Sequence, residues 1–276
     1  MAENNSTTPQ GAYFVALGGN RYEPTERAGG AWSPDEIHFA PLGGLITHAI
    51  EQHVAAAEES GRRGDGLQVA RISFDILGFL AAQPIDIAVE TVRPGRSIEL
   101  VEATATIAGR AAVRARAWFL DSFDTRSVAG GQGEPLPGPE SAVSLPLRTV
   151  WSGGFVASLD ARAAGASEPG RGTVWLATET ALVAGEEASP LASWIGLIDT
   201  ANGVAVRQSP AEWMFPNVDL TVHLHRRPAG RWIGLDTTVV FGAQGHGLTS
   251  SVLHDETGPV GVAQQALTIR PLSPEH

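Results

Sequence analysis

Side chains able to do chemistry gather in residues 213–230 of the sequence. Apolar and polar residues alternate from 218 to 225, the period of a β-strand with one buried and one polar face. Asp219 is the least expected member, because aspartate is disfavoured in strands. It is the first candidate for a carboxylate that accepts a proton in general base catalysis, and the alternative is a charge on the solvated face of the strand.

Two histidines on the same strand suggest a different chemistry. His223 and His225 form a His-x-His pair that could bind zinc with Asp219, His246 or His254 as the third ligand. Asp219 lies six residues from His225, roughly 20 Å along an extended strand, which is too far to share a metal ion with it. The chain also has no cysteine and no Gly-x-Ser-x-Gly motif, which argues against thiol and serine nucleophiles. We therefore expect neither a metal nor another cofactor.

Charge and hydropathy limit the possible partners. The 276 residues carry a net charge of −11, whereas nucleic acids and anionic membranes require a basic surface. Residues 1–10 are polar, read as a frayed tail, and lack the pattern of a signal peptide. No apolar run approaches the roughly 18 residues of a membrane helix. The sequence predicts a cytoplasmic protein that binds neither nucleic acid nor membrane.

The same order of elements is predicted twice along the chain. The spacing of apolar residues predicts a helix from Gly43-Gly44 to a stop at Gly61, and a second from the cap at Ser189 to a stop at Asn202-Gly203. Strands are expected on both sides of each helix: 13–17, 69–79, 85–92, 97–107 and 110–120 in the first half, and 173–183, 218–224, 232–241, 247–254 and 261–269 in the second. Each half therefore has one strand, one helix and four strands.

The amino-acid sequence repeats, as well as the order of the predicted helices and strands. Residues 109–119 match 258–268, and Asp75 in the first half matches Asp219 in the second. Gly and Pro punctuate the segment between the halves, as in a linker. We predict two fused copies of one unit, with boundaries at 12–122, a linker at 123–146, and 147–272.

A nearly apolar helix enclosed by an antiparallel sheet and duplicated in tandem resembles the double-hotdog fold, an α+β class. The motif from Phe215 through Asp219 to Arg226, followed by Trp232, Gln265 and Arg270, resembles the C-terminal half of the type II acyl-CoA thioesterases. Leu42-Gly43-Gly44 stands where that family has His-Gly-Gly. The resemblance implies hydrolysis of a fatty acyl-CoA to a free acid and coenzyme A, without a cofactor.

The resemblance also implies a catalytic site. In the family an Asp, a Thr or Ser and a Gln hold and activate the attacking water, and two of these fall on Asp219 and Gln265. The hydroxyl position falls on Val239 or Val240, and Thr238 is one residue away, on the opposite face of a regular strand. Gln265 places an amide among the apolar residues of its strand, where a buried amide needs a hydrogen-bond partner. This supports a role for Gln265 independently of the family.

Substrate-binding groups are expected around this site. Arg226, Arg227 and Arg231 form the densest basic cluster of the second half and could bind the phosphates of coenzyme A, and Trp232 could line the acyl channel. Backbone N–H groups at predicted helix starts, near Gly43 and Gly44 or at the start marked by Ser189-Pro190, are candidate donors to an oxyanion.

The first copy is expected to be inactive. It has Asp75 with Arg116 where the second copy has Asp219 with Gln265, and an ion pair would hold Asp75 ionised and weaken it as a base. We expect one active site per chain and a homodimer. Two alternatives remain open: a non-catalytic protein that binds or senses acyl-CoA, favoured by the valines at the hydroxyl position, and a hotdog hydratase or dehydratase acting on enoyl-CoA.

Overall fold

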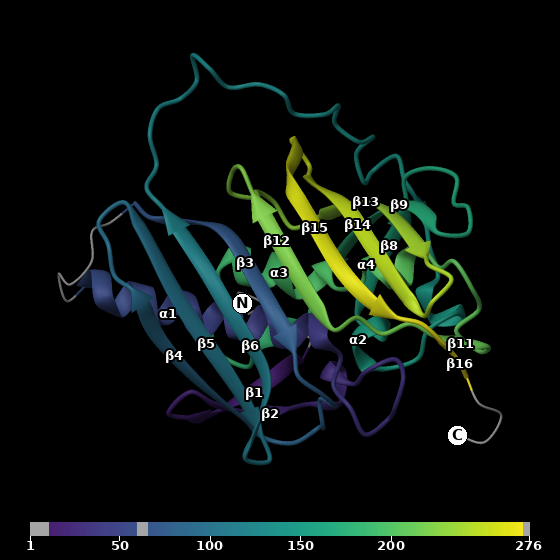
Figure 1. Cartoon of the computed structure of the whole chain (residues 1–276), viewed down its shortest axis with the longest axis horizontal. Helices are drawn as coiled ribbons and strands as arrows, with labels where there is room; N and C mark the ends of the chain where they lie inside the picture. Colours follow the sequence, from purple (N-terminus) through teal and green to yellow (C-terminus); the bar gives the residue numbers. More distant parts are fainter. Residues whose placement is uncertain (1–10, 60–65, 273–276) are drawn as a thin grey trace, which may run out of the picture.

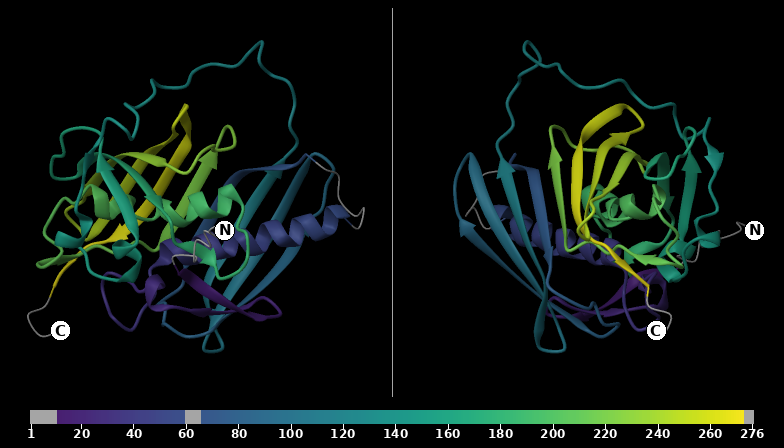
Figure 2. Two further views of the ribbon diagram at one scale, coloured as in Figure 1. Left: turned by 180° about the vertical axis from the view of Figure 1, so that it is seen from behind. Right: turned by 45° about the vertical axis from the view of Figure 1, so that its right-hand side comes forward.

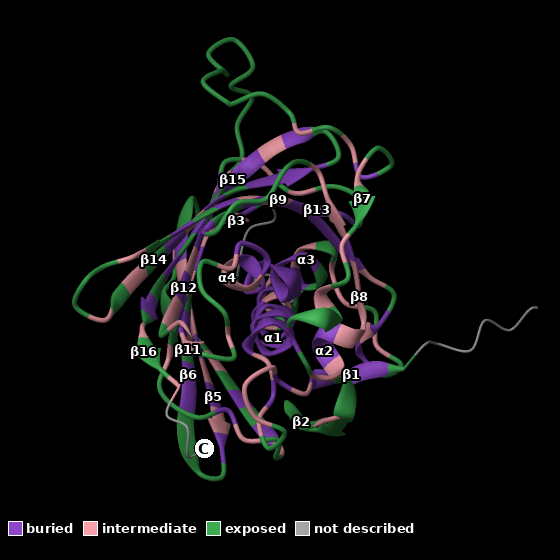
Figure 3. Ribbon diagram, turned by 90° about the vertical axis from the view of Figure 1, so that its right-hand side faces the viewer, coloured by how far each residue is buried: buried purple, intermediate pink, exposed green. Residues whose placement is uncertain are grey.

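A single curved sheet surrounds the central helices of this protein. The computed structural model describes residues 11–59 and 66–272. Fourteen strands of the described chain form one sheet in the order β10-β1-β2-β4-β5-β6-β3-β12-β15-β14-β13-β9-β8-β7, antiparallel except where β1 and β10 run parallel. Seen end on, α1 and α3 lie inside the curve of the sheet (Figure 3). The predicted α+β double-hotdog architecture is confirmed.

The first repeat contains the predicted helix and the strands on both sides of it. The helix α1 (Phe39–Glu59) begins four residues before Gly43, so the prediction that the glycine pair opens it is wrong. Its predicted stop, Gly61, and the tail 1–10 lie outside the described residues. The strands are β1 (Ala12–Gly18), β2 (Arg21–Pro24), β3 (Gln68–Ile76), β4 (Ile85–Arg93), β5 (Ile98–Ile107) and β6 (Arg110–Leu120).

The second repeat differs from prediction at its helix. Ser189 caps α3 (Pro190–Ile198) by accepting the N–H of Ala192, as predicted, but α3 ends before the expected stop and a short α4 (Ala201–Val204) follows. The predicted strand 173–183 is two strands, β9 (Arg171–Thr178) and β10 (Ala181–Val183). The other strands are β7 (Val143–Ser144), β8 (Leu159–Ala163), β12 (Asp219–Leu224), β13 (Ile233–Phe241), β14 (His246–Asp255) and β15 (Gly258–Thr268), with a separate pair β11 (Trp213–Met214) and β16 (Arg270–Pro271).

The two repeats meet along a sheet pairing and a helix crossing. Strands β3 and β12 pair antiparallel, with Asp75 opposite Asp219. Inside the sheet, α1 and α3 cross at Gly44 and Gly196, where a Cβ on Gly44 would lie 2.8 Å from the carbonyl oxygen of Ala192. Only glycine permits so close an approach of two helix backbones. An approximate two-fold axis therefore relates the two repeats. The two opposite ends of the α1–α3 pair consequently lie in equivalent surroundings.

The segment between the repeats has no regular secondary structure from 121 to 142 and passes outside the body of the protein (Figure 2). Its ends join β6 of the first repeat to β7 of the second. No helix of the described chain is both long and apolar enough to cross a membrane.

Candidate active site

Asp199 is the buried carboxyl around which the candidate site forms. It directly follows the last residue of α3 and is 4% exposed. Its Oδ1 atom accepts hydrogen bonds from Asn217 Nδ2 at 2.7 Å and from Gln265 Nε2 at 2.8 Å. Burial raises the pKa of Asp199 to about 7, and the two amide donors offset only part of this effect. A carboxyl with such a pKa can exchange protons near neutral pH, as a general base must.

A β-bulge at the start of β12 turns Asn217 toward Asp199. From Thr221 onward β12 pairs regularly with β15, but Asn217 bridges to Leu267, one residue out of that register. The extra residue, Val218, reverses the alternation of side chains, so Asn217 lies beside a buried residue instead of on the outer face. Strict alternation, from which the strand was predicted, contains no sign of a bulge, and Asn217 was therefore missed.

Asp219, the predicted base, lies on the outer face of the sheet. Its Oδ1 atom accepts the backbone N–H of the exposed Ala266 at 2.6 Å, and its backbone oxygen accepts from Asn217 Nδ2 at 2.9 Å. Gln265, next to Ala266 in the chain, points to the inner face and is buried. The structure therefore does not bring the side chains of Asp219 and Gln265 together. The Asp219 carboxylate instead fastens β12 to β15 at the bulge.

Gln265 has a hydrogen-bonding partner in the core, but that partner is Asp199. It lies on β15 between the buried Ala263 and Leu267. Its Nε2 donates to Asp199, while its Oε1 is buried and finds no hydrogen-bond partner within the described residues. A buried amide oxygen in this state can accept a hydrogen bond from a molecule in the site.

The start of α1 forms the opposite side of the site. His38 Nδ1 accepts the N–H of Ala40 at 3.0 Å and lies 3.7 Å from Asp199 Oδ2. Burial lowers the pKa of His38 to about 4, so the ring is neutral at pH 7. The backbone N–H of Phe39, the first residue of α1, has no acceptor in the part of the chain that the structure describes. The positive end of the α1 dipole therefore faces the carboxyl.

A pocket of ≈ 440 Å³ contains this carboxyl. Its walls come from both repeats, with Phe79 in the segment after β3 and Val218 at the bulge among the apolar residues and Arg270 as a cationic one. A larger cleft of ≈ 1060 Å³ shares Trp32 and Arg270 with the pocket and adds Arg148. An apolar cavity that leads to a carboxyl, beside a cleft with arginines, suits a long ligand with an apolar end and an anionic end.

Thr238 lies away from the site, on the outer face of β13. Its neighbours Thr237 and Val239 are buried, and Thr237 Oγ1 is 2.7 Å from Ser251 Oγ. Thr238 and Val240 are exposed. The strand keeps its regular register with β14 here, so no local shift brings the Thr238 hydroxyl to Gln265.

Gly43 and Gly44 have a packing role. Both lie inside α1, beyond its unpaired first turn, and Gly44 makes the crossing with α3. Their N–H groups are consequently used within the helix and are not at its start.

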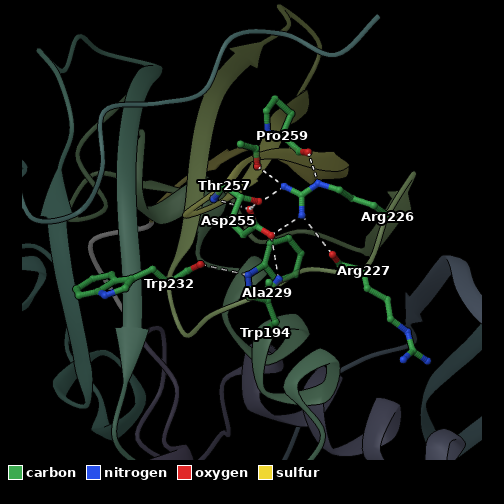
Figure 4. Close-up of polar contacts among 9 residues, drawn as sticks. Trp194, Arg226, Arg227, Ala229, Trp232, Asp255, Thr257 and Pro259 are labelled. Carbon is green, nitrogen blue, oxygen red and sulfur yellow. Dashed lines mark hydrogen bonds and ion pairs between the residues drawn. The ribbon is translucent and has the colours of Figure 1, made fainter. Parts of the chain in front are cut away.

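The three predicted arginines do not form one binding cluster. Arg226 forms a two-point ion pair with the buried Asp255, at 2.5 and 2.7 Å, and also donates to backbone oxygens. Arg231 pairs with Glu179. Arg227 is exposed, forms no ion pair within residues 11–59 and 66–272, and points away from the Asp255 network in Figure 4. Of these three arginines, only Arg227 is therefore available to an anionic ligand.

Trp232 is buried by the protein itself. It packs with Trp175, and the guanidinium of Arg162 lies 4.4 Å from its ring centroid. Its backbone oxygen accepts from Trp194 Nε1 at 3.4 Å (Figure 4). The ring does not line the pocket that contains Asp199.

The remaining polar predictions also lie on the outer face. His223 and His225 are both exposed. Arg116 bonds to Glu102 at 2.6 Å, so the predicted ion pair between Arg116 and Asp75 is not formed. The sequence match of the two repeats aligned Arg116 with Gln265. The two side chains are not equivalent, because Arg116 points outward and Gln265 inward.

Two family descriptions match the chain. The acyl-CoA thioesterase N-terminal domain matches residues 29–120, and the acyl-CoA thioesterase C-terminal domain matches residues 132–269. The chain belongs to the acyl-CoA thioesterase family. The two matched ranges place one family domain in each repeat, and the second contains Asp199, Asn217 and Gln265. No curated protein sequence matches the chain.

Several solved structures share the fold. An acyl-CoA thioesterase II, TesB2, from Mycobacterium marinum is 17% identical, with a TM-score of 0.61 over 94% of this chain and 96% of that one. A tesB protein from Mycobacterium avium subs paratuberculosis is 18% identical, with a TM-score of 0.62 over the same shares. A hot dog fold protein from Alicyclobacillus acidocaldarius is 14% identical, with a TM-score of 0.67 over 95% of this chain and 97% of that one.

Proposed function

We propose that the protein hydrolyses an acyl-CoA thioester, with Asp199 as the general base. The single observation that carries this proposal is the buried carboxyl held by two amides, Asn217 and Gln265, in a pocket that both repeats form. Family membership supports the substrate class, and the raised pKa of Asp199 supports its role.

The residues suggest how the reaction proceeds. Ionised Asp199 accepts a proton from water as the water oxygen attacks the thioester carbon. Gln265 Oε1 accepts a second hydrogen bond from that water and orients it. The carbon–sulfur bond then breaks, and the proton held by Asp199 passes to the sulfur to give the coenzyme A thiol. General base catalysis of this kind contributes roughly 10²- to 10⁴-fold.

The start of α1 supplies the oxyanion donor in this proposal. The unpaired N–H of Phe39 and the helix dipole behind it stabilise negative charge on the carbonyl oxygen. His38 is neutral, and its Nδ1 atom already accepts the N–H of Ala40. That nitrogen therefore does not donate a proton to the oxyanion. This role replaces the one predicted for Gly43 and Gly44.

Coenzyme A is proposed to lie in the larger cleft. Arg148 and Arg270 line it, and guanidinium groups bind phosphate through charge-assisted hydrogen bonds. The acyl chain then enters the pocket beside Phe79 and Val218. A homodimer in the cytoplasm remains our expectation, to be tested by sedimentation and by cell fractionation.

The experiment is thiol release from short, medium and long acyl-CoAs by three variants. Asp199→Asn should lose about 10²-fold or more in kcat. Asp219→Ala should lose far less, and Asp219→Asn, which keeps an acceptor for the N–H of Ala266, should retain most activity. If Asp219 were the base, Asn and Ala at this position would be equally inactive. The absence of turnover in the wild type, or full activity in Asp199→Asn, would overturn the proposal.

A further inference from the structure

The approximate two-fold axis gives the candidate site a counterpart at the other end of the helix pair. The candidate site combines the end of α3, the start of β12, the end of β3 and the start of α1. A second pocket, of ≈ 510 Å³, combines the later turns of α1, the start of β3, the end of β12 and the start of α3. If the two repeats are exchanged, the elements that line the first pocket become those that line the second.

Each pocket also has a carboxyl that reaches the residue before the opposing helix. In the candidate site Asp199 faces His38, which precedes α1. In the second pocket the Glu51 carboxylate is hydrogen-bonded to the Ser189 hydroxyl, and Ser189 precedes α3. Because Ser189 Oγ accepts the N–H of Ala192, its proton is free to go to Glu51. Burial raises the pKa of Glu51, while Ser189 and, more weakly, Arg227 oppose that effect.

The lining of the second pocket is apolar with a charged rim. Its walls include Val54, Leu67, Val69, Leu191 and Leu224. Arg227, the predicted binding arginine that forms no ion pair in the described chain, also lines it. Among the described residues the lining contains no Asn or Gln, so the amide pair that holds Asp199 has no equivalent there.

We propose that this pocket is a second, non-hydrolytic binding site for a fatty acyl chain with an anionic group at its polar end. The chain packs among the aliphatic walls, and Arg227 at the rim binds the anionic group. Acyl-CoA and the free fatty acid share this chemistry, and the inference rests on the proposed function for the choice of an acyl ligand. Without amides to hold a water beside Glu51, the bound ligand stays intact.

The test is a calorimetric titration of the Asp199→Asn variant, with decanoyl-CoA in one arm and decanoate in the other. In at least one arm we expect two binding events per chain. Adding Arg227→Glu should weaken one of them at least about tenfold, the loss of one charge-assisted contact, and Leu191→Trp should remove it by filling the pocket. Arg110→Glu, an equal charge reversal at the exposed start of β6, is the matched control and should change neither event.

Circular dichroism and thermal unfolding establish that each variant is folded. One event per chain in both arms, insensitive to Arg227→Glu and Leu191→Trp, would overturn the inference and leave the proposed function intact. One event that both substitutions weaken, in a chain whose wild type shows no turnover, would sustain the second site and overturn the proposed function. The more affected arm identifies the ligand as thioester or free acid.

Discussion

Replacing Asp199 by asparagine should stabilise the protein while it abolishes hydrolysis. An ionised Asp199 is costly in the fold because its pKa is about 7 there, against 3.8 for an ordinary aspartate. The protonated form is therefore favoured by folding, and the corresponding stability is present below pH 3.8 and lost as pH rises through 7. At 1.36 kcal/mol for each unit of pKa, the full cost is about 4 kcal/mol. Asparagine never ionises and keeps an acceptor for Asn217 and Gln265.

The assay is urea unfolding of both proteins at about pH 5 and about pH 8.5. The free energy of unfolding of the variant, relative to that of the wild type, should rise by about 3 kcal/mol between these pH values, the part of the cost that falls in this window. Asp86→Asn, which removes an exposed carboxylate on β4, is the control for a general change of charge. A relative stability that does not change with pH, or that falls as pH rises, would refute a costly buried carboxylate at Asp199.

Three further outcomes follow from the same geometry. The wild-type kcat/KM should rise with pH and level off above about 7, because only ionised Asp199 accepts a proton; a flat profile between pH 5 and 8 would contradict this. Asp219→Ala should lower kcat up to about tenfold with little change in KM, by loosening the bulge at the cost of one hydrogen bond of roughly 1.5 kcal/mol, and Asp219→Asn should restore most of that loss. Gly44→Ala should lower the free energy of unfolding by about 1–3 kcal/mol because its Cβ would overlap α3, whereas Gly165→Ala, with open space around it, should be tolerated; chemical denaturation of both measures the difference.

Hydrophobic periodicity predicted most of the long strands. The strands from 69 to 120 and the last four strands appear where alternation placed them, since each has one face against the helices. The cap at Ser189 was also found from residue types alone. The strands β7 and β8 were missed, because their surroundings are rich in Gly and Pro and they contain only a few residues each.

The site was less accessible to this reasoning, because two irregularities create it. Asp199 falls inside a run that reads as one apolar helix to residue 203, and only the early end of α3 makes it a terminal carboxyl. Asn217 reaches it through a bulge that reverses the period of two. Gln265 was assigned from the family resemblance, and alternation, which places it in the core, supported that assignment. Long-range partners such as Asp199 and Gln265 depend on the packing of α3 against β15, which local pattern does not contain.

The parallel pairing of β1 with β10 has a consequence for how this molecule holds together. These strands belong to different repeats, and so do β3 and β12, so the halves are joined at two places in the sheet as well as at the helix crossing. The segment from 121 to 135 then acts mainly as a tether that keeps two associating halves at high local concentration, whereas Leu136 and Pro137 pack against Trp175 of the second repeat. We expect a chain cut within 121–135 to remain assembled as two fragments. Because the two halves are fused and need not be identical, the two ends of the helix pair can differ, with an amide-held carboxyl at one end and a different lining at the other.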